Sequence, residues 1–297
     1  MRRLLLAAMV FGAATGAQAA DMPDFLRGSI SAPAPTPNRN WNGWYGGVQA
    51  GYESTEIDFS RSVVSLTNFI FRNSVLQAPT SQWSLLNKNH AQGSSFGVFG
   101  GRNYQWEDVV FGFEVNYNYF TNTKSSSAST ISLGIVNPPG TVPPPGHTYT
   151  YNTSMTGQAA LEIKDVTTFR GRAGWATGNF LPYVFGGLAV GRMQVARSVT
   201  TNVILKDDEV VSTTDAFGNV TTFSLAPVFT PIPSLSQSNS ELRTNSFVAG
   251  WTGGLGMEYM LWDCVFLRGE WEYIKFLQVK DTVVTLNSAR LGIGYKF

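Results

Sequence analysis

The sequence predicts an all-β protein, an eight-stranded antiparallel up-and-down barrel that crosses a membrane with its strands. Apolar and polar residues alternate with a period of two in segment after segment. Short and long connections alternate along the chain, and the charged side chains share the glycine-rich face of the strands. Composition agrees with this class, because 30 of the 297 residues are Gly, 13% are aromatic and only 14% are charged.

The beginning of the chain predicts export. Two arginines precede an apolar run at residues 4–12, and the small-residue tripeptide AQA follows it, so residues 1–20 are expected to be a cleaved signal peptide. The apolar run is shorter than the roughly 20 residues that a spanning helix needs. Residues 21–40 are expected to form a Pro-rich periplasmic linker, and residues 41–297 the outer-membrane barrel.

Eight segments with alternating apolar residues are expected to be the barrel strands. They lie near residues 44–54, 94–104, 109–120, 165–177, 181–192, 245–260, 263–276 and 286–297. Three connections between them are only a few residues long, whereas the others, at residues 55–93, 121–164, 193–244 and 277–285, are expected to be longer loops. An outer-membrane barrel predicts this alternation, because its periplasmic turns are short and its extracellular loops are long.

The apolar face of each strand is expected to contact lipid. In the last segment Leu291 and Ile293 fall on one face and Arg290 on the other. A water-soluble barrel points its apolar face inward, but here the charges share a face with many glycines, which suits a narrow interior. Trp and Tyr residues near strand ends, Tyr183 among them, are expected to form aromatic girdles, and Gly186 is expected to face inward.

Nine charged side chains are therefore expected to point into the barrel as candidate lumen-lining residues: Glu53, Glu114, Arg170, Arg172, Glu258, Arg268, Glu270, Glu272 and Arg290. Buried charges of opposite sign must pair to avoid a large desolvation cost. Pairing favours a plugged barrel with a structural role. The alternative is that the same residues line a narrow aqueous channel for small solutes.

Several motifs carry a resemblance to a known family. They are AQAADMP at the signal junction, NWNGWYGGVQAGY at residues 40–52, FRGRAGW at residues 169–175 and the terminal ARLGIGYKF. With these motifs the chain resembles the small porin-like outer-membrane proteins of alphaproteobacteria, which share the architecture of the OmpA transmembrane barrel. The resemblance covers the strands and both chain ends but not the long loops.

That resemblance implies a location in the bacterial outer membrane and a structural or narrow-porin function. It also implies that Phe297 is the terminal aromatic residue that the barrel-assembly machinery recognises. The expected partners are outer-membrane lipid, the assembly machinery, periplasmic chaperones, and small solutes or surface ligands. Near-neutral charge gives no indication of nucleic-acid binding.

An enzymatic function is not expected, and neither is a cofactor or a metal. The sequence has no HExxH motif, and its two histidines, His90 and His147, lie in expected loops. A surface-binding or adhesion protein that acts through its long loops is the alternative function. The family that the chain resembles includes haem-binding surface proteins, so under that alternative either histidine could ligate haem iron.

Overall fold

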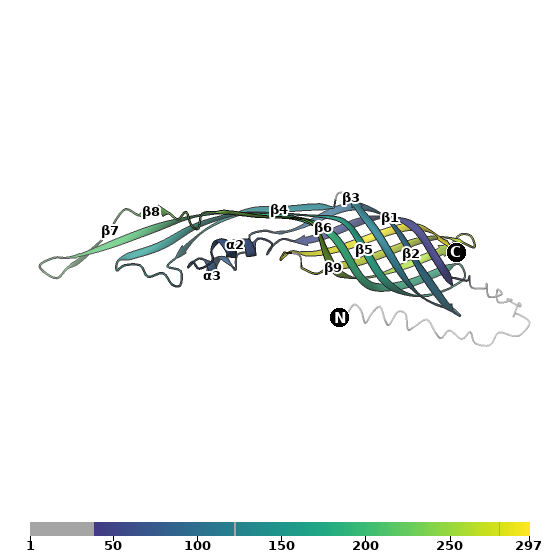
Figure 1. Cartoon of the computed structure of the whole chain (residues 1–297). Helices are drawn as coiled ribbons and strands as arrows, with labels where there is room; N and C mark the ends of the chain where they lie inside the picture. Colours follow the sequence, from purple (N-terminus) through teal and green to yellow (C-terminus); the bar gives the residue numbers. More distant parts are fainter. Residues whose placement is uncertain (1–38, 122, 279) are drawn as a thin grey trace, which may run out of the picture. The chain divides into compact units, whose positions relative to one another are not determined.

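A computed structural model describes residues 39–121, 123–278 and 280–297, and its central feature is a closed barrel of eight antiparallel strands (Figure 1). In order around the barrel the strands are β1 (Gly43–Asp58), β2 (Lys88–Trp106), β3 (Val109–Thr121), β5 (His147–Trp175), β6 (Phe180–Thr214), β9 (Ser238–Met260), β10 (Val265–Phe276) and β11 (Val283–Lys296). The last strand pairs with the first, Tyr45 lying opposite Lys296. The predicted fold class is confirmed, whereas the expected signal peptide and most of the expected linker lie outside the described residues.

Short turns join β2 to β3, β5 to β6 and β9 to β10 at one rim of the barrel. Two of these turns use a left-handed backbone conformation, at Glu107 (φ 55°) and Gly178 (φ 57°). The chain also ends at this rim, where the backbone N–H of Phe297 donates to the carbonyl oxygen of Trp44 at 2.9 Å. The expected short periplasmic turns are therefore all found together.

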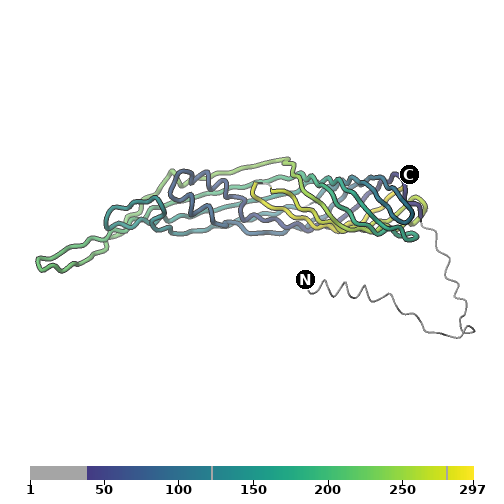
Figure 2. The backbone as a smooth tube through the Cα atoms, turned by 90° about the horizontal axis from the view of Figure 1, so that it is seen from below, coloured from purple at the N-terminus to yellow at the C-terminus, as the bar shows by residue number. Residues whose placement is uncertain are grey.

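The long connections at the other rim differ from the expectation, because most of their residues form strands. Strands β5 and β6 are 29 and 35 residues long and remain paired far beyond the barrel (Figures 1 and 2). Strand β4 (Lys124–Val136) pairs with β5, and β7 (Val220–Ser224) and β8 (Val228–Pro231) pair with β6. The expectation of loops at residues 121–164 and 193–244 was wrong. We call the part of the sheet that extends beyond the barrel, formed by β4, β7, β8 and the long extensions of β5, β6 and β9, the extracellular sheet.

Two β-bulges explain why alternation failed to reveal the extensions of β5 and β9. One lies between Ile163 and Asp165 of β5, and the other lies where β9 pairs with Met193 and Val195 of β6, close to Asn245 (φ 57°). One extra residue reverses which alternate residues face inward. An alternating pattern that is followed through a bulge therefore changes phase, although the same side of the sheet continues to face the interior.

The first long connection, expected to be a loop at residues 55–93, is also folded. It contains α2 (Val64–Ile70) and α3 (Gln77–Thr80), and we call residues 59–86 the plug segment. Its side chains Phe59, Phe71 and Leu76 are fully buried and belong to one apolar cluster with residues of β5, β6, β9, β10 and β11. No helix in the described ranges has the length and apolarity to cross a membrane.

The two wall faces of the barrel are confirmed in outline, with two corrections. Leu291 and Ile293 are exposed on the outside, whereas Arg290 is buried. Tyr183, expected in a girdle, is instead 4% exposed inside the barrel. Gly186 faces outward and its neighbour Gly187 faces inward. The consecutive glycines in this segment carry no side chains that could reveal the phase of the alternation.

The interior consists of three layers rather than one polar lumen. At the rim with the short turns lies an aromatic and apolar cluster: Trp41, Tyr45, Phe99, Val110, Ala176, Leu181, Tyr183, Phe185, Met260 and Phe266. The charged residues form the middle layer. The large apolar cluster with the plug segment fills the space toward the extracellular sheet. The inward-facing residues near the ends of the strands are therefore apolar.

Candidate functional site: the charged interior

The structure places all nine predicted charged side chains inside the barrel, where none is more than 6% exposed. Five are glutamates and four are arginines. Three pairs are direct cross-strand neighbours: Glu114 with Arg170, Glu258 with Arg268, and Glu270 with Arg290. Opposite charges on adjacent strands attract, so the strand register itself brings acid and base together.

Glu114 and Arg170 lie at the centre of the network. Arg170 donates to the Oε1 atom of Glu114 from Nε at 2.9 Å and from Nη2 at 2.5 Å. The same Nη2 donates to both oxygens of Glu270, at 2.6 and 2.7 Å. Glu114 also accepts hydrogen bonds from the Tyr45 hydroxyl at 2.7 Å and from Asn116 at 2.8 Å. The Arg170 guanidinium thus bridges the carboxylates of Glu114 on β3 and Glu270 on β10, two strands on opposite sides of the barrel.

Glu258 accepts hydrogen bonds from the other two central arginines, Arg172 and Arg268. Arg172 binds it through two parallel hydrogen bonds, 2.8 and 2.7 Å long, which is the strong bidentate arrangement. Arg268 donates to Glu258 at 2.7 and 3.0 Å and to Glu114 at 2.5 Å. Arg290 completes the set by pairing with Glu272 and, at 3.5 Å, with Glu270.

The aromatic layer contacts the network directly. The guanidinium of Arg268 lies 3.7 Å from the ring centre of Phe99, and that of Arg172 lies 4.0 Å from Tyr183. The Tyr183 hydroxyl donates to Glu270 at 2.6 Å. Cation–π contacts strengthen when water is excluded. The aromatic rings therefore stabilise the arginines on the side that the carboxylates leave open.

Glu53 differs from the other eight residues, because no described arginine lies within ion-pairing distance of it. It accepts a hydrogen bond from the Ser95 hydroxyl at 2.5 Å, and its Oε2 atom has no hydrogen-bond partner among the described residues. Residues 93–97 have the spacing G-x-S-x-G, but Ser95 lies within β2 and not on a strand-to-helix turn. The geometry therefore lacks the exposed nucleophile of that motif.

Sequence reasoning missed the polar side chains that complete the network. Tyr45, Asn116 and Tyr183 are buried and bonded to its carboxylates, and Thr252 donates to Glu272 at 2.7 Å. Asn116 alternates in phase with Glu114 and could have been found in that way. The tyrosines could not, because an interior tyrosine and a girdle tyrosine have the same sequence signal.

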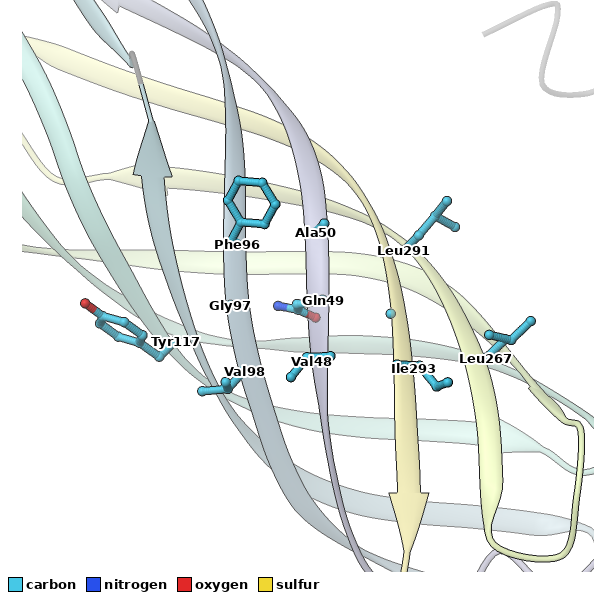
Figure 3. A pocket seen from close by; sticks show the side chains of 11 residues that line it. Val48, Gln49, Ala50, Phe96, Gly97, Val98, Tyr117, Leu267, Leu291 and Ile293 are labelled. Atoms are coloured by element: carbon cyan, nitrogen blue, oxygen red, sulfur yellow. The ribbon is translucent and has the colours of Figure 1, made fainter.

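On the outside, the wall is apolar and carries a hollow of about 670 Å³ (Figure 3). Ala50 of β1 pairs with Phe96 of β2 and with Leu291 of β11. A small side chain between two large ones leaves this hollow. The hollow lies on the apolar outer wall of the barrel.

Phe297 and the two histidines lie outside the charged interior. Phe297 is 80% exposed and its ring packs edge-on against Tyr295. His90 is exposed on β2, and the Nδ1 atom of His147 on β5 lies 2.9 Å from Asp207. The assembly role of Phe297 and haem ligation by either histidine stay predictions.

A closed strand barrel with an apolar outer wall and a charge-paired interior defines a transmembrane β-barrel of the bacterial outer membrane. The chain belongs to the outer membrane protein beta-barrel domain family, whose match covers residues 4–297.

Relatives with similar sequences are outer-membrane proteins of Brucella. The chain is 25% identical to the 31 kDa outer-membrane immunogenic protein of Brucella melitensis over the full length of both, and 21% identical to the 25 kDa outer-membrane immunogenic protein of Brucella ovis over 92% of this chain and 88% of that one.

Among solved structures, Neisserial surface protein A matches 86% of this chain and 97% of its own, with 15% identity and a TM-score of 0.31. The attachment invasion locus protein of Yersinia pestis matches 86% and 99%, with 10% identity and a TM-score of 0.29.

Proposed function

We propose that the protein is a closed outer-membrane anchor that holds the extracellular sheet on the cell surface and conducts no solutes. The observation that carries this proposal is the filled interior. The aromatic cluster, the charge network and the apolar cluster follow one another along the barrel, and their large side chains are buried. An eight-stranded barrel has an interior just wide enough for such side chains.

The charge network supports plugging rather than conduction. Eight of the nine charged residues are bound to each other, with Arg170 and Arg268 each contacting more than one carboxylate. A channel that selects ions with charged side chains needs those groups free to exchange with the passing ions. Side chains locked in short ion pairs and also packed on aromatic rings lack that freedom.

Conductance in a planar lipid bilayer tests the proposal. The mature protein, refolded and checked for heat-modifiable migration in gels, is expected to give no discrete, salt-dependent current steps, like its heat-denatured control. Steps in the wild type whose ion selectivity changes in Arg170→Ala or Glu270→Ala would overturn the proposal and favour the narrow porin. That result would show that these side chains line a conducting path.

The anchor also supports the second candidate function, surface binding. The extracellular sheet is built from β4, β7, β8 and the long extensions of β5, β6 and β9. A barrel needs none of these residues to close, yet they are folded into ordered strands. Surface recognition gives this sheet a role, and the absence of enzymatic activity stays a prediction.

A further inference from the structure

One continuous outer wall runs from the barrel into the extracellular sheet, and its chemistry changes along the way. The outward residues of β6 are first apolar, with Val184 61% and Leu188 66% exposed. Arg192 follows, paired with Asp165. Beyond it, every second residue is small or polar, through Thr200 to Asn202. The strand keeps the same inward and outward phase throughout, so these residues share one wall.

Beyond Arg192 the outer face carries neutral polar groups in rows that cross the sheet. We call them the hydroxyl rows, and the strand register defines them: Ser126, Ala160, Ala196 and the one large apolar member, Leu242; Ala128, Gln158, Ser198 and Ser240; Thr130, Thr156, Thr200 and Ser238; and Ser132, Ser154 and Asn202. Strands lie about 4.8 Å apart, and alternate residues of one strand roughly 6.7 Å apart. The rows therefore form a regular array of mostly short side chains.

Hydroxyl groups of neighbouring strands are bonded to each other within these rows. The distance is 2.9 Å between the hydroxyl oxygens of Thr130 and Thr156 and 3.0 Å between those of Thr200 and Ser238. A hydroxyl has one donor and two acceptor sites. Each bonded pair therefore keeps hydrogen-bonding capacity for a ligand, while its lateral bond holds the side chain in place.

The rows also enclose two shallow hollows. One, of about 520 Å³, lies over Ala128, Gln158 and Ser198, and the other, of about 280 Å³, lies over Ser132, Ser154 and Asn202. Alanines and serines leave room between the longer side chains at the edges. A ligand can approach the sheet closely at these places.

The chemistry of the rows selects the ligand class. A protein partner is usually held by buried aromatic or arginine anchors, and the rows contain neither. The rows contain no charged residue, and the two charged residues that border the larger hollow, Arg197 and Glu241, pair with each other, so a charged polymer gains no ion pair from the rows. A neutral saccharide presents hydroxyl groups that donate and accept in the same way as the rows do.

The order of side chains along the wall identifies the source of the saccharide. Apolar residues come first, then a narrow charged band in which Lys164 pairs with Glu162 and Arg192 with Asp165, with Lys124 beside them, and then the hydroxyl rows. Lys124 is exposed and lies opposite Glu162, whose carboxylate pairs with Lys164. A glycolipid of the outer leaflet has the same sequence of acyl chain, charged headgroup and sugar.

We propose that the hydroxyl rows bind the neutral saccharide chain of a glycolipid in the protein's own outer leaflet. This inference rests on the proposed function, because it requires the barrel to hold the extracellular sheet outside the cell. The proposed binding surface is the outward face of the extracellular sheet next to the membrane, and not the ends of its strands far from the barrel.

The test measures binding of two probes to the full-length mature protein in phosphatidylcholine nanodiscs by calorimetry. The probes are the lipopolysaccharide of the source strain and its lipid-free neutral polysaccharide. Saturable binding of both is expected, with the intact glycolipid tighter. The variant Thr156→Glu/Thr200→Glu changes two residues that pair across strands, and it is expected to weaken binding of the polysaccharide at least tenfold.

A matched control is Thr213→Glu/Thr221→Glu, which changes two exposed threonines that also pair across strands, but in the hairpin of β6 and β7. It is expected to bind as the wild type does. If the glutamate variant fails to fold, Thr156→Val/Thr200→Val keeps the shape of both side chains and is expected to lower affinity at least threefold. No saturable binding by the wild type, or equal losses in the row and control variants, would overturn the inference.

Self-association is a further outcome. A wild-type dimer in native mass spectrometry that Thr156→Glu/Thr200→Glu separates would show that a second copy covers the face, and this too would overturn the inference. Conductance of the same nanodisc preparation, transferred to a planar bilayer, separates the two proposals. A conducting barrel that binds saccharide contradicts only the closed anchor, and a silent barrel that does not bind contradicts only the hydroxyl rows.

Discussion

Replacing Arg170 by Met removes the central cation of the interior while keeping a long apolar stem. The guanidinium is buried and contacts three carboxylates, those of Glu114 and Glu270 at 2.5 and 2.6 Å and that of Glu272 at 3.4 Å. Its loss leaves a buried excess of negative charge. Breaking a buried ion pair by removing one partner costs about 3–5 kcal/mol. We expect Arg170→Met to lower the free energy of unfolding by about that amount.

Two remaining contacts argue against a larger loss. Glu114 keeps its bond from Arg268 at 2.5 Å, and Glu270 keeps the Tyr183 hydroxyl at 2.6 Å. Neutralising one orphaned acid should recover part of the stability, so the double variant Arg170→Met/Glu270→Gln is expected to be more stable than Arg170→Met alone. A favourable coupling of this kind is what a double-mutant cycle measures.

The assay is reversible urea unfolding in lipid vesicles, followed by tryptophan fluorescence. Lys206→Met is the control, because Lys206 and its partner Asp208 are 33% and 36% exposed and lie outside the network, so a loss below about 1 kcal/mol is expected. A loss below about 1 kcal/mol for Arg170→Met as well would refute the reasoning. It would mean that the interior charges are hydrated and not held in a dry network.

Three further predictions follow from other parts of the chain. Gly187→Ala should prevent folding, because its Cβ atom would lie 2.0 Å from the carbonyl oxygen of Phe169, whereas Gly171→Ala, with nothing within 4 Å, should fold normally; the heat-modifiable gel band reports both. Phe297→Ala should reduce the amount of protein assembled in the outer membrane of cells. It should change the free energy of unfolding of the refolded protein by less than about 1 kcal/mol, because Phe297 is exposed and its hydrogen bond to Trp44 is made by the backbone. A loss of unfolding free energy that accounts for the loss of assembled protein would contradict a role in assembly. Hydrogen bonds from Lys280, Arg197 and Arg243 lower the pKa of the Glu241 carboxyl from 4.5 to about 2. Because the pKa of Glu241 is lower in the folded state than in the unfolded state, its ionised carboxylate stabilises the folded protein. This stabilisation is complete above about pH 4.5 and is lost as the pH falls toward 2. Unfolding between pH 6 and 2 should therefore show a steeper loss of stability for the wild type than for Glu241→Gln, and parallel curves would contradict the assignment.

The sequence alone determined the membrane-spanning half of the molecule. In that half one face of every strand contacts lipid and the other a narrow interior, so a period of two is enforced residue by residue. Val115 and Tyr117 alternate with Glu114 and Asn116 for this reason. The same constraint places the nine charged residues on the inward face of the strands.

Only the tertiary structure decided what lies beyond the membrane. Water tolerates many side chains on an exposed strand face, so alternation in the extracellular sheet is weaker, and the bulge between Ile163 and Asp165 shifts its phase. The apolar residues of the plug segment are separated by polar ones, and their burial depends on strands β5 and β6, more than 50 residues away in the chain. Which arginine pairs with which glutamate was likewise set by long side chains that reach across the barrel, as Arg268 reaches Glu114, and no spacing in the sequence encodes that contact.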